Sequence, residues 1–219
     1  MKGLLTKDIL ILRGQIRSLL LVLLCGIIMS FSFEPTVVIA YLTIVGAMTA
    51  SGTIGYDEFD HGYSFLFTLP FERKTYVHEK YVLCIGFGLL CTILGIVAAT
   101  AIILFRGGGT EMFADILPTA IMMTVMIILL MSMMIPIRVK YNSEKGKTVQ
   151  FVIYGALLVL TFGIGGFMDK LGINVSSRLE AFFTSINEYA LFAALLAVCI
   201  CILFLSVKTA ERIIEKKEY

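Results

Sequence analysis

The chain has 219 residues, of which 58% are hydrophobic and only 16% are charged, and its formal net charge is +2. Because a water-soluble domain usually carries about 25% charged residues, this composition excludes an ordinary soluble protein. The longest stretches outside the apolar segments are Tyr56–Lys80 and Asp169–Glu188, and neither is long enough for a separate soluble catalytic domain.

The first element is the leader Met1–Arg17, which places Leu5, Ile9, Leu12 and Ile16 at helical spacing and its cationic residues elsewhere. This pattern predicts an amphipathic interfacial helix on the inner membrane surface. The alternative interpretation is a basic flank that only sets topology. No small-residue cleavage site follows, so we expect a retained helix rather than a cleaved signal peptide.

Six segments without any Asp, Glu, Lys or Arg then fill more than half of the chain. A helix needs roughly 20 apolar residues to cross a hydrocarbon core of about 30 Å. Five segments are long enough, and the first is too if its helix begins slightly earlier. Because lipid offers no partner to backbone polar groups, each segment must be helical. We therefore predict an all-α polytopic membrane protein with six transmembrane helices: Ser18–Phe33, Thr36–Gly55, Tyr81–Phe105, Ile116–Ile137, Phe151–Met168 and Tyr189–Val207.

The cationic residues indicate the orientation. All but three of the 18 Lys and Arg residues lie in the N-terminal leader, the second and fourth connections and the C-terminal tail. Since positively charged loops stay cytoplasmic, both termini are predicted to be cytoplasmic. The predicted organisation is an interfacial helix at 1–17, a six-helix membrane domain at 18–207 and a basic cytoplasmic tail at 208–219.

The long cytoplasmic connection Tyr56–Lys80 begins with acidic residues, turns aromatic and apolar, and ends with basic residues. Pro70 interrupts it, since proline cannot continue a helix from its interior. We expect a short helix at about Asp60–Thr68 and a second helix that starts near Glu72. Exposed aromatic side chains commonly mark partner-docking surfaces, although they also suit the headgroup belt of a membrane.

Between the second and third segments, short motifs follow one another in a fixed order: Asp57-Glu58, Leu69-Pro70, Arg73-Lys74, Val77 and Lys80-Tyr81. The order is similar to that in the permease subunit of ABC-2 type exporters, and the opening Met1–Asp8 and the six-span layout fit the same family. The resemblance covers essentially the whole chain. The nearest group is bacterial peptide exporters, including those for phenol-soluble modulins.

The resemblance implies a multi-pass subunit of a bacterial plasma membrane that catalyses nothing itself. A separate ABC ATPase would bind ATP and Mg²⁺ and dock on a coupling helix within about 56–80, so this chain would need no cofactor of its own. It implies a second permease copy, as a homodimer or a related heterodimer, and we expect no nucleic-acid partner. The candidate ATPase-binding residues are Asp57, Glu58, Tyr63, Phe65, Leu66, Leu69, Arg73 and Lys80.

The uncharged segments independently argue against a membrane enzyme and an ion-driven carrier, which usually place ionisable groups within the bilayer. They favour hydrophobic or amphipathic cargo, with peptides as one such class. The alternative function is a secondary transporter or channel that ATP does not drive. We expect no metal site, because His61 and His78 lie far apart in the sequence and the five cysteines form no ligand pattern.

Two features of the apolar segments remain open. The fourth segment is rich in methionine, and Met122, Met126 and Met133 are candidate cargo-lining residues because flexible thioethers accept varied apolar partners. Ordinary helix packing is the alternative. In the second segment, small residues spaced four apart, such as Gly46 and Ala50, predict a close helix contact, either within the subunit or across a dimer.

Overall fold

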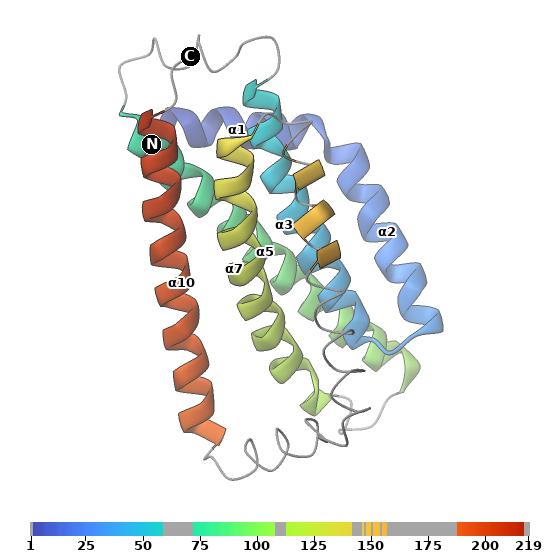
Figure 1. The fold of residues 1–219 in the computed structure, drawn as a ribbon. Helices are drawn as coiled ribbons and strands as arrows, with labels where there is room; N and C mark the ends of the chain where they lie inside the picture. Colours follow the sequence, from blue (N-terminus) through green and yellow to red (C-terminus); the bar gives the residue numbers. More distant parts are fainter. Residues whose placement is uncertain are drawn as a thin grey trace.

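The computed structural model (Figure 1) describes residues 2–58, 72–107, 113–141 and 188–216, together with 146, 148–149, 151–153 and 155–156. Within these ranges the regular structure is helical and no strand is present, which confirms the all-α fold class for the described part. The helices are α1 (Lys2–Gly14), α2 (Ile16–Ser32), α3 (Thr36–Glu58), α5 (Arg73–Arg106), α7 (Ile116–Lys140) and α10 (Glu188–Lys216).

Three of these helices, α3, α5 and α7, are long and apolar enough to cross a membrane. α1 and α2 pass the same test only as a pair that is bent by 63°, and they would add a fourth span. α10 covers the sixth predicted segment, whereas most of the fifth, Phe151–Met168, lies outside the described residues. The chain is therefore a multi-pass helical membrane protein, and the count of six spans stays a prediction.

The helix boundaries follow local backbone chemistry. The extended backbone of Glu72 (φ −74°, ψ 140°) precedes α5, which begins where the sequence predicts a helix after Pro70. Gly107 ends α5 in the left-handed conformation (φ +67°), which glycine adopts without steric penalty. The predicted interfacial helix is shorter than expected, because α1 ends at Gly14, and Ile16 and Arg17 already belong to α2.

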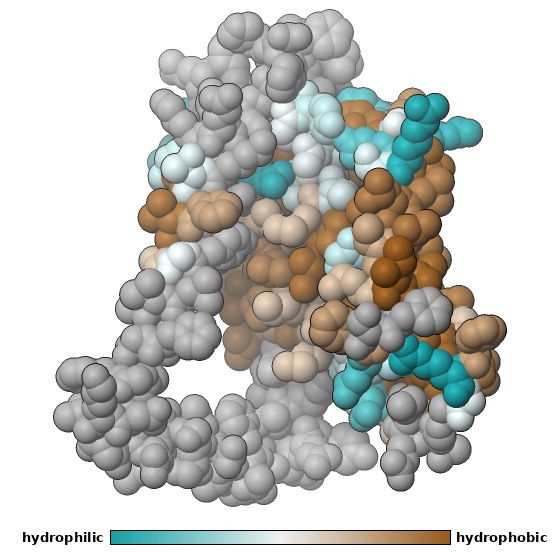
Figure 2. All heavy atoms as spheres, turned by 90° about the vertical axis from the view of Figure 1, so that its right-hand side faces the viewer, coloured by the Kyte–Doolittle hydropathy of each residue, from teal (hydrophilic) through white to brown (hydrophobic). Residues whose placement is uncertain are grey.

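α1 lies across one end of the bundle formed by the longer helices (Figure 1). The N-terminal end of α5 and the C-terminal ends of α3, α7 and α10 meet at this end, which we call the α1 end. It collects the described basic residues of the leader, of the second and fourth connections and of the C-terminal tail, as the charge distribution predicts. Figure 2 shows hydrophobic surface between hydrophilic groups near the two ends of the molecule, which is the profile of a membrane-embedded bundle.

α3 and α5 are the most closely packed pair of helices. Their contacts show whether the small residues of α3 meet a helix within the subunit or across a dimer. A Cβ atom added to Gly95 would lie 2.8 Å from the Cα of Ile39, and one added to Gly46 would lie 2.7 Å from the Cβ of Cys91. Thr43 donates a hydrogen bond to Thr92 between these contacts, at 3.0 Å. The close contact of Gly46 is therefore made within the subunit, where missing side chains let two helices approach.

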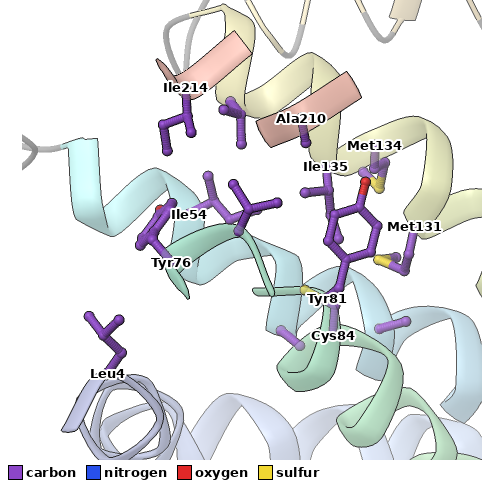
Figure 3. Close-up of a cluster of buried hydrophobic side chains, with 14 of the residues drawn as sticks. Leu4, Ile54, Tyr76, Tyr81, Cys84, Met131, Met134, Ile135, Ala210 and Ile214 are labelled. Carbon is purple, nitrogen blue, oxygen red and sulfur yellow. The ribbon is translucent and has the colours of Figure 1, made fainter. Parts of the chain in front are cut away.

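The largest cluster of buried apolar side chains lies at the α1 end (Figure 3). Leu4 of α1, Ile54 of α3 and Tyr76 of α5 lie near one another on one side of it, and Ile214 of α10 lies nearby. Five helices contribute to this core, so the α1 end is where the bundle is most completely joined. The cluster includes Leu4, Ala47, Ala50, Ile54, Tyr76, Val77, Tyr81, Cys84, Ile127, Met131, Met134, Ile135, Val139, Ala210 and Ile214.

Candidate functional site

A fully buried lysine joins three helices beside this core. The Lys80 ammonium lies 2.6 Å from a carboxylate oxygen of Asp57 on α3, and it also donates to Asp8 on α1. The hydroxyl of Thr53 accepts a further hydrogen bond from Lys80 at 3.2 Å. The side chain of Lys80 is 0% exposed, and a buried charge is tolerated only when it is paired and hydrogen-bonded.

A second lysine closes the network from α1. Lys7 pairs with the other oxygen of Asp57 and lies 3.2 Å from Asp8. The hydroxyl of Tyr76 donates to Asp57 at 3.0 Å, so this carboxylate is held by three different side chains. We call this group the ion-pair cluster, and it comprises Lys7, Asp8, Asp57, Tyr76, Glu79 and Lys80.

The helices bring these residues together for simple geometric reasons. Leu4, Asp8 and Leu12 lie on one face of α1 at four-residue spacing, and all three are buried against the bundle. The carboxylate of Asp8 is therefore buried together with the apolar side chains of Leu4 and Leu12. Asp57 and Lys80 stand near the two ends of the connection 59–71, so the cluster links both flanks of that connection to α1.

Glu79 is the unbalanced member of the cluster. Its side chain is fully buried, and among the described residues neither carboxylate oxygen has a hydrogen-bond partner. Asp8 and Lys80 are among the charged groups that act on it electrostatically. The cluster thus holds three carboxyl groups but only two lysines.

This imbalance predicts that Glu79→Gln raises the stability of the protein by about 1–2 kcal/mol, because a neutral amide replaces a buried carboxyl group that has no hydrogen-bonded partner. A glutamine amide can also donate to Asp8, which has a carboxylate oxygen without a hydrogen bond in the described structure. Thermal unfolding in detergent micelles measures the effect. Glu72→Gln, on the exposed start of the same helix, should leave the midpoint unchanged. A midpoint for Glu79→Gln below that of the parent protein would contradict this account.

Tyr81, the residue after Lys80, contacts the helices on the other side of α5, namely α10 and α7. The Tyr81 hydroxyl is hydrogen-bonded to the Ser206 hydroxyl of α10, which in turn donates to the carbonyl of Ser132 on α7. From the end of α7, Arg138 donates to the carbonyl of Ser51 on α3 at 2.6 Å. The adjacent pair Lys80-Tyr81 therefore connects α5 to α1 and α3 on one side and to α7 and α10 on the other.

Ion pairs and a hydrogen bond also hold the first turns of α5 against the end of α10. Lys74 lies 3.2 Å from Glu215, and His78 lies 3.1 Å from Glu211. Arg73 donates to the carbonyl of Ile214 at 3.3 Å, which places a cation at the last turn of a helix, where the dipole favours it. The N-terminal part of α5 is thus held by α1, α3 and α10 together.

The predicted ATPase-binding residues divide into two groups. Asp57 and Lys80 lie in the ion-pair cluster, Arg73 contacts the end of α10, and Glu58 is the last residue of α3. The other four lie outside the described residues, so their contact with an ATPase stays a prediction; they are Tyr63, Phe65, Leu66 and Leu69.

The candidate cargo-lining methionines also differ from one another. Met122 and Met126 are 71% and 45% exposed, whereas Met133 is half-buried. Met131 and Met134 of the same helix pack in the core at the α1 end. Part of the methionine content of α7 therefore serves ordinary packing, while Met122 and Met126 remain available to an apolar partner in the described structure.

Sequence reasoning missed Lys7, Tyr76 and Glu79 as site residues and treated Asp8 only as part of an opening motif. A usable signal was present, because Asp8 interrupts an apolar stripe of an amphipathic helix four residues from Leu4 and from Leu12. A carboxylate on a buried face needs a cationic partner. The cations closest to the ends of apolar segments, such as Lys80, were the natural candidates.

The cluster is suited to joining helices. In the described part of the chain, no three His, Cys, Asp or Glu side chains are grouped so that they could hold a metal ion. Each lysine of the cluster pairs with two carboxylates from different helices. A displacement applied to the connection 59–71 would therefore reach α1, α3 and α5 together.

A comparison with known families extends these observations to nearly the whole chain. Residues 3–215 match the family model described as ABC-2 family transporter protein. The match begins within α1 and ends within the last turn of α10, so it includes every residue of the ion-pair cluster. No curated protein and no solved structure matches the chain.

Proposed function

The chain belongs to the ABC-2 family of transporter proteins, and from that premise we propose that it is the permease subunit of an ATP-driven ABC exporter. In this proposal a separate ABC ATPase binds and hydrolyses ATP, and this chain provides the path across a bacterial plasma membrane. The observation that carries the proposal is the ion-pair cluster, which joins both flanks of the connection 59–71 to α1.

The ATPase is proposed to dock on this connection at the α1 end. Asp57 and Arg73 border the connection, and each is tied to other helices, Asp57 to α1 and Arg73 to α10. A displacement of the connection would therefore move α1, α3, α5 and α10 together. A partner can shift a conformational equilibrium only if it binds the two states differently, and the flanks of 59–71 are where such a difference would be felt.

The cargo is proposed to be hydrophobic or amphipathic, with peptides as the favoured class. The stretch Tyr81–Phe105 of α5 and the stretch Ile116–Ile137 of α7 contain no Asp, Glu, Lys or Arg, and Met122 and Met126 offer an adaptable apolar surface. Export is proposed to need a second permease copy, identical or related, because the known arrangement of this family pairs two permeases with two ATPases.

Docking can be tested by co-expressing the chain with an ABC ATPase encoded by a neighbouring gene. Tyr63→Ala and Phe65→Ala should each weaken co-purification of the ATPase at least tenfold, since aromatic anchors commonly contribute about 2 kcal/mol or more at an interface. Binding is measured by titration in nanodiscs, and ATP hydrolysis by phosphate release.

The matched control is Phe105→Ala, which removes an 86% exposed aromatic side chain at the opposite end of α5. It should leave ATPase binding unchanged. If all three variants bind the ATPase like the parent protein, the connection 59–71 is not the docking element. If the isolated chain hydrolyses ATP, the division of labour between permease and ATPase is wrong.

A further inference from the structure

An apolar pocket of about 160 Å³ lies between α2, α3 and α5. The first turns of α2, from Ile16 to Leu23, form one wall, and Phe87, Cys91 and Leu94 of α5 form the other. Its lining is almost wholly apolar and it is partly open to the outside. A dry apolar cavity of this size holds small apolar groups and does not fill with water.

At the bend between α1 and α2, two cations flank the pocket-lining Ile16 in the sequence. Arg13 lies in the last turn of α1 and Arg17 in the first turn of α2, on either side of Ile16. Both arginines are exposed, and no ion pair joins either of them to another described residue. Arg17 also borders the charge-free stretch that begins at Ser18, so it sits where headgroups meet hydrocarbon.

We propose that this pocket binds one acyl chain of an anionic phospholipid, with the phosphate of the lipid against Arg13 and Arg17. The apolar walls accept the chain, and the two guanidinium groups complement the charge and geometry of a phosphate. The proposal does not depend on the ATPase or on cargo export. It identifies the bend between α1 and α2 as the place where the protein distinguishes anionic from neutral lipids.

The size of the pocket favours a lipid chain over a protein partner. One turn of an α-helix with its side chains is about 10 Å across and 5.4 Å long, so it occupies several hundred cubic ångströms, more than the pocket of about 160 Å³. The surface around the opening is also lipid-like in character, since Leu20, Leu24 and Leu90 are more than half exposed. A single extended hydrocarbon chain can enter such an opening from the surrounding bilayer.

The absence of tryptophan from the sequence provides a clean test. Leu20 lines the pocket and Leu21 does not, yet their exposed fractions are nearly equal, 61% and 63%. Each is replaced in turn by Trp as the only tryptophan, and the protein is reconstituted with brominated phosphatidylglycerol or brominated phosphatidylcholine. Quenching of Trp fluorescence gives the relative binding constant of the two lipids at each position.

For Leu20→Trp we expect phosphatidylglycerol to be preferred at least about fivefold, which is the effect of one cationic side chain near a membrane surface. Leu21→Trp should show a ratio near one. Replacing both Arg13 and Arg17 by Gln in the Leu20→Trp protein should bring its ratio to near one, whereas Arg212→Gln, an exposed arginine of α10, should not change it.

Three results would overturn the proposal. A ratio near one at Leu20→Trp would show that the pocket does not select an anionic lipid. An equal preference at Leu21→Trp would show general attraction of anionic lipid to the surface instead of a site. A preference that survives the double arginine replacement would show that the phosphate is not held by Arg13 and Arg17. Because Leu20 and Leu21 are mostly exposed, both reporters are expected to fold like the parent protein.

Discussion

Lys80→Met is expected to destabilise the protein by about 3–5 kcal/mol, the usual effect of removing one partner from a buried ion pair. The methionine fills a similar volume, so loss of packing contributes little. The charge left behind is the cause: Asp8, Asp57 and Glu79 would then share Lys7 as the one lysine of the cluster. Unfolding can be followed by the reaction of a thiol-specific dye with the buried Cys84 and Cys199.

Lys74→Met is the matched control, because it removes a lysine from the same helix and breaks an ion pair of which both members are about half exposed. Exposed pairs contribute little to stability, so the unfolding midpoint of Lys74→Met should stay close to that of the parent protein. Equal midpoints for the two variants would show that the ion-pair cluster does not hold α1, α3 and α5 together.

Gly95→Ala is expected to destabilise the protein by about 1–3 kcal/mol, the usual effect of overpacking a close contact. The added methyl group would lie 2.8 Å from the Cα of Ile39, which is backbone and has no rotamer to change. α3 and α5 would have to separate, and the Thr43–Thr92 hydrogen bond between them would lengthen or break. Thermal unfolding in micelles measures the effect.

Gly86→Ala makes the same substitution two to three turns earlier in α5, at a position where the added methyl group meets nothing within 4 Å. There the higher helix propensity of alanine should leave the stability equal or raise it by up to about 1 kcal/mol. The two variants are thus expected to change stability in opposite directions. A loss of equal size in both would mean that the effect comes from the helix itself and not from its contact with Ile39.

Much of the fold could be predicted from the sequence, because lipid imposes a strong constraint on length and composition. The charge-free runs Thr36–Gly55, Tyr81–Phe105 and Ile116–Ile137 correspond to α3, α5 and α7, and each helix extends beyond its run. The extensions matter most in α5, which begins eight residues before Tyr81 and carries Lys80 and Glu79. Because these first turns of α5 are polar, the apolar run does not reveal that they belong to the same helix.

The site was harder to predict because its members are far apart in the sequence. Asp57 and Lys80 each look like an ordinary charge beside an apolar run, and only packing shows that both are buried together with Asp8. The resemblance to ABC-2 permeases named Asp57 and Lys80, but for a contact with an ATPase rather than with each other. Their mutual pairing depends on the approach of three helices, which periodicity within one helix does not encode.

The fit between α3 and α5 also limits how this protein can change shape. Ile39 and Cys91 each occupy the space left by a glycine on the facing helix, and the Thr43–Thr92 bond lies between these two contacts. Sliding one helix along the other would drive side chains into both places, so a shear motion of this pair is blocked sterically. The fit therefore favours rearrangements in which α3 and α5 turn together as one body.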